Sequence, residues 1–240
     1  MIQEGSDFDD VLKQAQALGY AERNPEADVE GYDACRKIAI LSSLAFDKQV
    51  DYQDIYTEGI TKITAADFEY ANAAEYTIKL LGRSRAIDDD TAEVMVAPFM
   101  LPKDHPLAMV YGVFNAVFVT GNMLGDSMYY GRGAGKLPTA SAVVSDVIDC
   151  ARHQGKVIMC FWDKEEVKLA DIGEAERSFF IRAKAGAEDA VTAAFPGGRM
   201  VHLKDRKEDF GYFTQSMKEK DFQAKYEALG GQMLGRIRLV

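Results

Sequence analysis

Asp33 and Lys37, two oppositely charged side chains spaced four residues apart, are the strongest candidates for chemistry in this sequence. On a helix this spacing places them on one face, where they can pair. A lysine beside carboxylates in a partly dry cleft is the kind of group that moves a proton. The plainer interpretation is a surface ion pair worth about 0.2–0.5 kcal/mol, which is far commoner than a catalytic pair. The spacing alone leaves both interpretations open.

The pair belongs to a highly charged stretch, GYAERNPEADVEGYDACRK, at residues 19–37. Its charged side chains are Glu22, Arg23, Glu26, Asp28, Glu30, Asp33, Arg36 and Lys37. A helix is predicted over about 31–46, beginning near Asp28 or Glu30, because an acidic residue suits a helix N-terminus. Residues 38–46 are apolar nearly all round, which predicts a helix buried on most sides whose first turn opens onto a cleft. The stretch is therefore either a solvated loop or the rim of an active site.

A glycine-rich segment, YYGRGAGKLPTASA at 129–142, leads into a helix predicted over 138–153. Glycines ahead of a helix can cradle a phosphate. Neither common nucleotide motif is complete. A dinucleotide fingerprint that starts at Gly131 needs glycine at position 136, which is Lys136, and a P-loop needs glycine at position 130, which is Tyr130. A tight strand-to-helix turn and a close approach of the backbone to a ligand both remain open.

The composition argues against several classes of partner. With 240 residues, 48% of them hydrophobic, and a net charge of −10, the chain is typical of a globular protein of one or two domains. The acidic balance argues against nucleic acid and against an anionic membrane surface. We expect no membrane span, because no apolar run is long enough, and no signal peptide at MIQEGSDFDD. Three cysteines and three histidines without metal-type spacing predict a cytoplasmic protein with no metal centre.

The pattern along the chain predicts an α/β (α+β) fold. We expect a mixed, mainly antiparallel sheet with helices on one face, followed by a smaller βαββαβ ferredoxin-like unit. The predicted strands are 75–82, 92–99, 110–121, 126–131, 177–184, 199–206, 209–216 and 233–240, and further helices are predicted at 7–18, 64–74, 187–195 and 220–229. The spread of apolar residues in 110–130 is compatible with a sheet covered on both faces. We place a first domain at 1–155, a junction at 156–173 and the βαββαβ domain at 174–240.

Three blocks of the sequence resemble the homoserine dehydrogenase family. They are LGYAERNPEADVEGYDACRKIAILSSLAF, HPLAMVYGVFNAV and YYGRGAGKLPTASAVVSDVIDCAR, which occur in the family's order within about residues 7–153. The resemblance implies an enzyme that interconverts L-homoserine and L-aspartate 4-semialdehyde in threonine and methionine biosynthesis. It implies NADP or NAD as the cofactor.

The resemblance also implies roles for single residues. Glu22 would bind the amino-acid end of homoserine, and Asp28 would line the same pocket. Asp33 would orient the substrate and water near the reacting alcohol, and Lys37 would donate or accept the proton. Gly135 would approach the cofactor, which gives the glycine-rich segment a use outside both nucleotide motifs.

The sequence departs from that family at three points. The family's N-terminal NAD(P)-binding domain and the first part of its catalytic domain have no counterpart here, so we expect this fragment to be inactive by itself. Asn24 stands where the family usually has aspartate. The βαββαβ unit resembles the family's regulatory ACT domain, but its first strand runs into AKAGAEDAV, which puts binding of an amino-acid effector, threonine above all, in question.

Two further expectations concern partners. The resemblance implies a homodimer, and a helix 138–153 that does not pack on a nucleotide domain should expose Val143, Val144 and Val147. The alternative function is a stand-alone amino-acid-binding regulatory module without catalysis. A plain interaction domain would require the charged cluster to be accidental.

Overall fold

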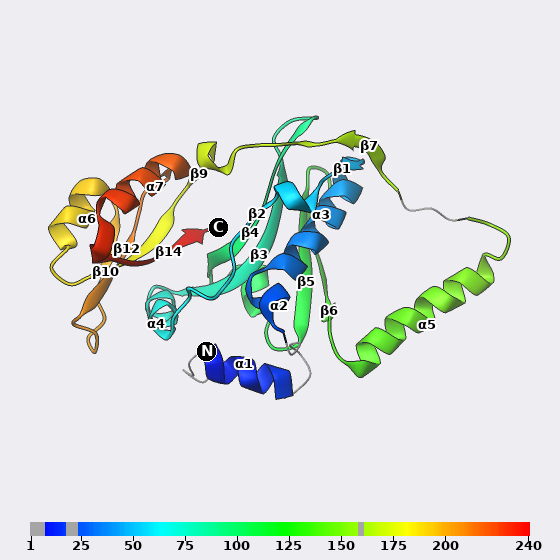
Figure 1. Ribbon diagram of the computed structural model, residues 1–240, viewed down its shortest axis with the longest axis horizontal. Coiled ribbons are helices and arrows are strands. Elements are labelled where there is room, and N and C mark those ends of the chain that lie inside the picture. The colour runs from blue at the N-terminus through cyan, green and yellow to red at the C-terminus, as the bar shows by residue number, and fades with distance from the viewer. Residues whose placement is uncertain (1–7, 18–23, 158–160) are drawn as a thin grey trace.

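The computed structural model of the protein describes residues 8–17, 24–157 and 161–240 (Figure 1). Its α-helices are α1 (Phe8–Ala17), α2 (Glu26–Val29), α3 (Tyr32–Phe46), α4 (Ala65–Ala73), α5 (Lys136–Arg152), α6 (Glu188–Ala194) and α7 (Glu219–Ala228). Short 3-10 helices are η1 (Tyr52–Asp54), η2 (Pro106–Met109), η3 (Ile172–Glu174) and η4 (Gly230–Gln232). In Figure 1, α6 and α7 lie at one end of the molecule and α5 extends away from the body at the other.

The strands form one large sheet and three two-stranded sheets. They are β1 (Lys48–Gln49), β2 (Tyr56–Thr57), β3 (Tyr76–Ala86), β4 (Thr91–Pro102), β5 (Phe114–Gly121), β6 (Gly125–Arg132), β7 (Asp163–Glu166), β8 (Lys168–Leu169), β9 (Glu176–Arg177), β10 (Phe179–Lys184), β11 (Arg199–Val201), β12 (Asp209–Phe213), β13 (Met217–Lys218) and β14 (Met233–Leu239). The predicted fold class is confirmed, since the longer strand pairings are antiparallel and helices pack on the sheet.

Strand β4 is the centre of the large sheet. Its sequence TAEVMVAPFMLP is apolar almost throughout, and every residue from 92 to 101 is buried, as expected of a strand covered on both faces. Strand β3 pairs with one edge of β4 along its whole length in antiparallel register. The other edge pairs in parallel with three strands in turn: β8, β2 and β14.

The last part of the chain has the predicted βαββαβ order, formed by β10, α6, β11, β12, α7 and β14. Its four strands lie in the order β11-β12-β10-β14, all antiparallel, which is the ferredoxin-like arrangement. These strands belong to the same sheet as β4, because Arg238 of β14 pairs with Phe99. The division of the chain at 155 and 174 stays a prediction.

Helices cover the two faces of this sheet in different places. One cluster of buried side chains joins Phe179 and Ile181 of β10 to Val191 of α6 and Phe222 of α7. The neighbouring residue of β10, Phe180, points to the opposite face and packs in another cluster with α4. The βαββαβ unit is therefore covered on both faces, and one of its covers comes from the N-terminal half of the chain.

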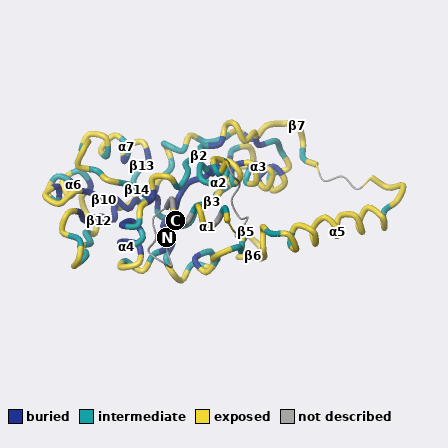
Figure 2. Tube along the Cα trace, turned by 60° about the horizontal axis from the view of Figure 1, so that its bottom comes forward, coloured by how far each residue is buried: buried dark blue, intermediate teal, exposed yellow. Residues whose placement is uncertain are grey.

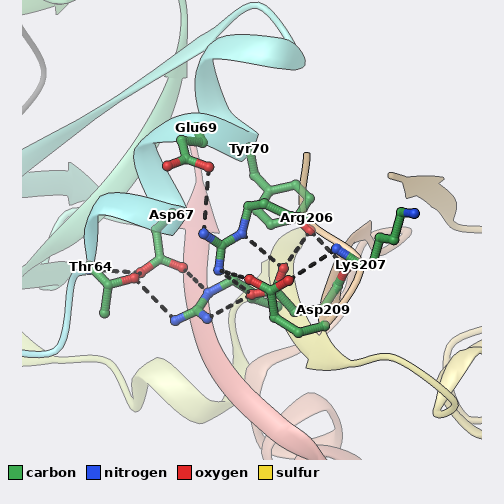
Figure 3. A network of polar contacts seen from close by, with 9 residues as sticks. Thr64, Asp67, Glu69, Tyr70, Arg206, Lys207 and Asp209 are labelled. Carbon is green, nitrogen blue, oxygen red and sulfur yellow. Dashed lines mark hydrogen bonds and ion pairs between the residues drawn. The ribbon is translucent and has the colours of Figure 1, made fainter. Parts of the chain in front are cut away.

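A buried network of charges reinforces this contact between α4 and the βαββαβ unit. Arg182 Nε of β10 lies 2.8 Å from Asp67 Oδ1 of α4, and Arg182 Nη1 lies 3.1 Å from Asp209 Oδ2 of β12. Tyr70 donates a hydrogen bond to Asp209 Oδ1 at 2.8 Å. Figure 3 shows Asp67 and Tyr70 of α4 converging on one point with Arg206 and with Asp209 of β12.

The prediction that α3 is buried on most sides is wrong. Its fully buried side chains are all small, namely Cys35, Ala39, Ser42 and Ser43, and Ile38 and Phe46 are only partly buried against the same core. The larger Ile40, Leu41 and Leu44 are 51%, 39% and 42% exposed. The reason is that α3 packs on one face of β3 and β4, while no other described segment covers its outer side.

Two other apolar surfaces are open in the described structure. The hairpin of β5 and β6 exposes Val117, Val119 and Tyr129, so the sheet predicted from 110–130 has one uncovered face. The exposed valines expected on the helix after the glycine-rich segment are confirmed, because Val143, Val144 and Val147 of α5 are all more than half exposed. Figure 2 shows α5 exposed along nearly its whole length.

Candidate active site

Asp33 and Lys37 meet on the first two turns of α3. Lys37 Nζ donates a hydrogen bond to Asp33 Oδ2 at 2.7 Å, as the spacing of four residues predicted. Asp33 lies in the first helical turn, where a negative charge interacts favourably with the helix dipole. The side chain of Lys37 is 68% exposed and that of Asp33 is 51% exposed. The pair therefore lies on the surface and not in the partly dry cleft expected from the sequence.

Two glycines fix the segment that leads into α3. Gly31 has φ +80°, a conformation that favours glycine, and a Cβ there would lie 3.1 Å from Val96 Cγ1. Gly59, in the loop after β2, allows a closer approach, since a Cβ on it would lie 2.4 Å from the carbonyl oxygen of Val29. Ile60 N donates a hydrogen bond to that same oxygen at 2.8 Å. The loop after β2 thus holds the end of α2 and fixes where α3 begins.

The other two predicted substrate residues are not joined to this pair. Asp28 lies in α2 with an exposed side chain. Among the residues that the structure describes, no hydrogen bond or ion pair links Asp28 to Asp33 or Lys37. Glu22 lies outside the described residues. The roles of all four residues stay predictions.

Gly133 and Gly135 differ in what surrounds them. A Cβ on Gly133 would lie 2.0 Å from Asn115 Nδ2 of β5, so a larger residue here would have to displace the Asn115 side chain. Gly135 is the N-cap of α5 with φ +111°, and the nearest atom to a Cβ there would be Pro138 Cδ at 3.7 Å. The space beside Gly135 is open at the N-terminus of a 17-residue helix, which offers free amide groups to an anion. Gly135 and the first turn of α5 therefore fit the anionic part of a dinucleotide.

Sequence reasoning missed a largely buried carboxylate next to the segment that leads into α3. It belongs to Glu58, which directly precedes Gly59. Its Oε2 accepts hydrogen bonds from Arg238 Nη1 at 2.7 Å and from the Tyr56 hydroxyl at 2.9 Å, and lies 3.4 Å from Arg236 Nη1. Burial raises the pKa of Glu58, but the two arginines outweigh it and leave the pKa below its ordinary value. The available signal was the alternation RIRLV in β14, which places both arginines on one face of the strand.

Other classes of site find little support in the described part of the chain. No three His, Cys, Asp or Glu side chains there are grouped so as to hold a metal ion. None of the described helices is both long enough and apolar enough to cross a bilayer. Cys35 is buried and its thiol donates to the carbonyl oxygen of Tyr52, while Cys150 is a free thiol on the surface of α5.

Comparisons with known proteins agree on one family. A family model described as homoserine dehydrogenase matches residues 1–148. The homoserine dehydrogenase of Synechocystis sp. is 53% identical over 152 residues, covering 62% of this chain and 35% of that one. The homoserine dehydrogenase of Mycobacterium tuberculosis H37Rv is 43% identical over 203 residues, covering 80% of this chain and 46% of that one.

Solved structures extend the similarity to the whole chain. The crystal structure of a homoserine dehydrogenase from Thiobacillus denitrificans superposes with a TM-score of 0.86 at 33% identity, covering 100% of this chain and 60% of that one. A homoserine dehydrogenase from S. aureus gives a TM-score of 0.78 at 29% identity with 61% of its chain covered. The chain therefore spans between 35% and 61% of the length of these relatives.

Proposed function

Because the chain belongs to the homoserine dehydrogenase family, we propose that it forms the substrate-binding part of an oxidoreductase. The reaction is the NAD(P)-dependent interconversion of L-homoserine and L-aspartate 4-semialdehyde in threonine and methionine biosynthesis. The observation that carries this proposal is the 2.7 Å pair of Lys37 and Asp33 on α3, within the residues that the family model matches. A proton-transferring group held by a carboxylate is what such a reaction needs.

In the reduction direction, the Lys37 ammonium donates a proton to the aldehyde oxygen as negative charge develops on it. Asp33 keeps the ammonium in place through the direct hydrogen bond. In the oxidation direction, neutral Lys37 accepts the hydroxyl proton. Asp28 and Glu22 supply negative charge for the ammonium group of the substrate.

Gly135 and the first turn of α5 would hold the cofactor, NADP or NAD, because this helix N-terminus has open space beside a glycine. When bound there, the cofactor supplies the hydride or accepts it. Among the described residues, the nearest atom to a Cβ at this position would be Pro138 Cδ at 3.7 Å, and a residue with a Cβ would have to adopt φ +111°.

We also propose that residues 174–240 form an ACT-like regulatory unit that binds a small amino-acid effector. The ferredoxin-like strand order supports this proposal. We further propose a homodimer, in which a second copy covers the open face of β5 and β6. The exposed Val117, Val119 and Tyr129 support it, since a patch of this kind is typical of an interaction surface.

The test is homoserine-dependent formation of NAD(P)H by the native-length protein and by its Lys37→Ala variant. We expect Lys37→Ala to lower kcat by about 10²- to 10⁴-fold, the usual contribution of a positioned proton donor. Lys156→Ala, a change at an exposed lysine beyond α5, is the matched control and should leave kcat unchanged. An unchanged kcat in Lys37→Ala would contradict the assignment of the proton donor. Amino-acid binding without any turnover would favour the stand-alone binding module.

A further inference from the structure

Helix α3 approaches β3 very closely at Gly82. A Cβ built on Gly82 would lie 2.9 Å from Ile38 Cβ and 3.3 Å from Ile38 Cγ1. Real Cβ atoms essentially never lie within 3.0 Å of such a neighbour, so a residue with a side chain does not fit at this spacing. Glycine inside a strand often marks a place where another segment comes close to the backbone. The missing side chain of Gly82 therefore sets how near α3 lies to the sheet.

A hydrogen bond two residues further along β3 makes a second point of contact. Ser42 Oγ donates to Ser84 Oγ at 2.8 Å, and Ser42 is buried. Gly82 and Ser84 belong to one face of the strand, while Ile38 and Ser42 lie one above the other on the helix. Four helical residues rise about 6.0 Å and two strand residues about 6.6 Å, so the two spacings match. Together the two contacts fix the depth of α3 and its direction along β3.

Helix α3 is the element that must yield if the space at Gly82 is filled. Strand β3 pairs with β4 at all 11 of its residues and is held in place. The outer side of α3 is open in the described structure, where Ile40 and Leu44 are exposed. Ile38 would meet the new atom through its own Cβ, so a change of rotamer alone does not relieve the contact. Widening the separation from 2.9 Å to an ordinary 3.4 Å means a shift of α3 by about 0.5 Å.

We propose that Gly82 is a positioning residue for Lys37, with Ser84 as a second one. Lys37 directly precedes Ile38 and pairs with Asp33 one turn earlier on α3. A displacement of Ile38 away from β3 therefore carries both members of the pair with it. This inference rests on the proposed role of Lys37 in proton transfer and adds what holds Lys37 at its place.

The first test is steady-state oxidation of homoserine by the native-length protein and by its Gly82→Ala variant. A misplacement near 1 Å can cost about 100-fold in rate, so a shift of about half that size should lower kcat by roughly tenfold. The KM for homoserine should change by less than about threefold, because Lys37 acts in the chemical step. Asp28, proposed to line the substrate pocket, belongs to α2, whose end is held separately by the contact of Gly59 with Val29.

A second variant and a control accompany Gly82→Ala. Ser84→Ala removes the hydrogen bond from Ser42 without adding an atom between α3 and β3, so it keeps the test valid if Gly82→Ala fails to fold. It should lower kcat by about two- to fivefold, and an unchanged kcat would count against the role of this contact. Gly231→Ala is the matched control, since among the described residues no atom lies within 4 Å of a Cβ there. Its kcat should equal that of the parent.

An exchange variant separates positioning from stability. Combining Gly82→Ala with Ile38→Gly removes the Cβ that the new alanine would meet on α3. We expect kcat to recover to the value of Ile38→Gly alone. The urea midpoint of unfolding should meanwhile fall below that of Gly82→Ala, because glycine destabilises a helix interior and the partly buried Ile38 side chain is lost. A merely structural role of Gly82 would instead make kcat fall together with the midpoint.

Crystal structures of the parent, Gly82→Ala and the exchange variant test the displacement without turnover. After superposition on β3 and β4, the Lys37 Cα should be displaced by about 0.5 Å or more in Gly82→Ala and restored in the exchange variant. An undisplaced Lys37 in Gly82→Ala, or a full displacement with unchanged kcat, would overturn the proposal. A parent that shows the displacement in its variant but oxidises no homoserine would refute the proposed function, while Gly82 would still be shown to set the position of Lys37.

Discussion

Replacing Arg182 by methionine should destabilise the protein strongly, because it removes the cation at the centre of a buried network. The Arg182 side chain is 10% exposed, and the carboxylates of Asp67 and Asp209 that it binds are 3% and 1% exposed. Methionine has an unbranched apolar side chain that fills irregular space but donates no hydrogen bond. The change leaves two carboxylates in place without this partner.

The size of the effect follows from what each carboxylate retains. Breaking a buried ion pair from one side costs about 3–5 kcal/mol. Asp209 keeps Arg206, whose Nε and Nη2 lie 3.0 and 2.8 Å from it. Asp67 keeps only the bonds from Thr64 N and Oγ1, at 2.8 Å each. We therefore expect a loss of about 3 kcal/mol, near the lower end of that range, and a fall in Tm of about 6–12 °C for a chain of this length.

The assay is unfolding in urea followed by far-ultraviolet circular dichroism and by the fluorescence of the single tryptophan. Trp162 donates a hydrogen bond to Gln49 beside the pair of β1 and β7, outside the Arg182 network. Its fluorescence therefore reports that region, while circular dichroism reports the helices and strands of the whole chain. If α4 and the βαββαβ unit unfold together with the rest, both signals should shift by the same amount in Arg182→Met. Arg152→Met, at an exposed arginine of α5, is the control and should change stability by no more than about 0.5 kcal/mol.

A double-mutant cycle with Asp67→Asn completes the experiment. Once Asp67 has lost its charge, removing Arg182 should cost clearly less than it does in the parent. A loss below about 1 kcal/mol in Arg182→Met would refute the reasoning from burial. Two separate unfolding transitions, only one of which moves, would refute the conclusion that this network joins the two parts of the chain into one cooperative unit.

Three further predictions concern other parts of the molecule. Burial alone would raise the pKa of Asp209, but hydrogen bonds from Arg206 and its neighbours outweigh it and hold the pKa at about 2. The lowered pKa stabilises the folded protein fully above about pH 4, and this stabilisation is lost as the pH falls through 2. Its size is about 2 kcal/mol. Asp209→Asn should remove this step from the pH profile of the free energy of unfolding. Gly59→Ala should lower the urea midpoint of unfolding, because the new Cβ would lie 2.4 Å from the Val29 carbonyl oxygen. An unchanged midpoint would show that the contact between the loop after β2 and the end of α2 relaxes without cost. Val144→Asp should reduce self-association in size-exclusion chromatography with light scattering, since Val144 is 55% exposed on α5, and an unchanged mass would count against this patch.

Local signals predicted the elements well. Helix α4 lies within the helix predicted at 64–74, and its start carries a local signal, because Thr64 and Asp67 form a capping box. Glycine and proline follow the helices of the βαββαβ unit, at Pro196-Gly197-Gly198 after α6 and at Gly230-Gly231 after α7. Phe179, Ile181 and Ala183 alternate along β10, and they lie on the face that packs on α6 and α7. Each of these signals lies within a few residues of the element that it predicts.

Contacts between distant segments could not be predicted in this way. Arg182 and Asp67 are 115 positions apart, so nothing near Arg182 in the sequence shows that the second face of β10 is covered. The same limit explains why α3 was expected to be buried, since its apolar composition does not show which side faces the sheet. At the candidate site, the spacing of Asp33 and Lys37 predicted their pairing, but the contact of Gly59 with Val29 depends on two segments that the pattern does not connect.

The pairing of β4 with remote segments has a consequence for synthesis on the ribosome. Residues 238 and 239 pair with Phe99 and Met100, and Pro102 and Leu239, the last residues of β4 and β14, are separated by 137 positions. At about 5–20 residues per second, β4 would wait roughly 7–27 s for this neighbour. During that interval one edge of an apolar strand presents free N–H and C=O groups, which can pair with another nascent chain. Chaperone protection of β4 is therefore most needed between the synthesis of these two strands, and shortening the chain by its final strand would make the exposure permanent.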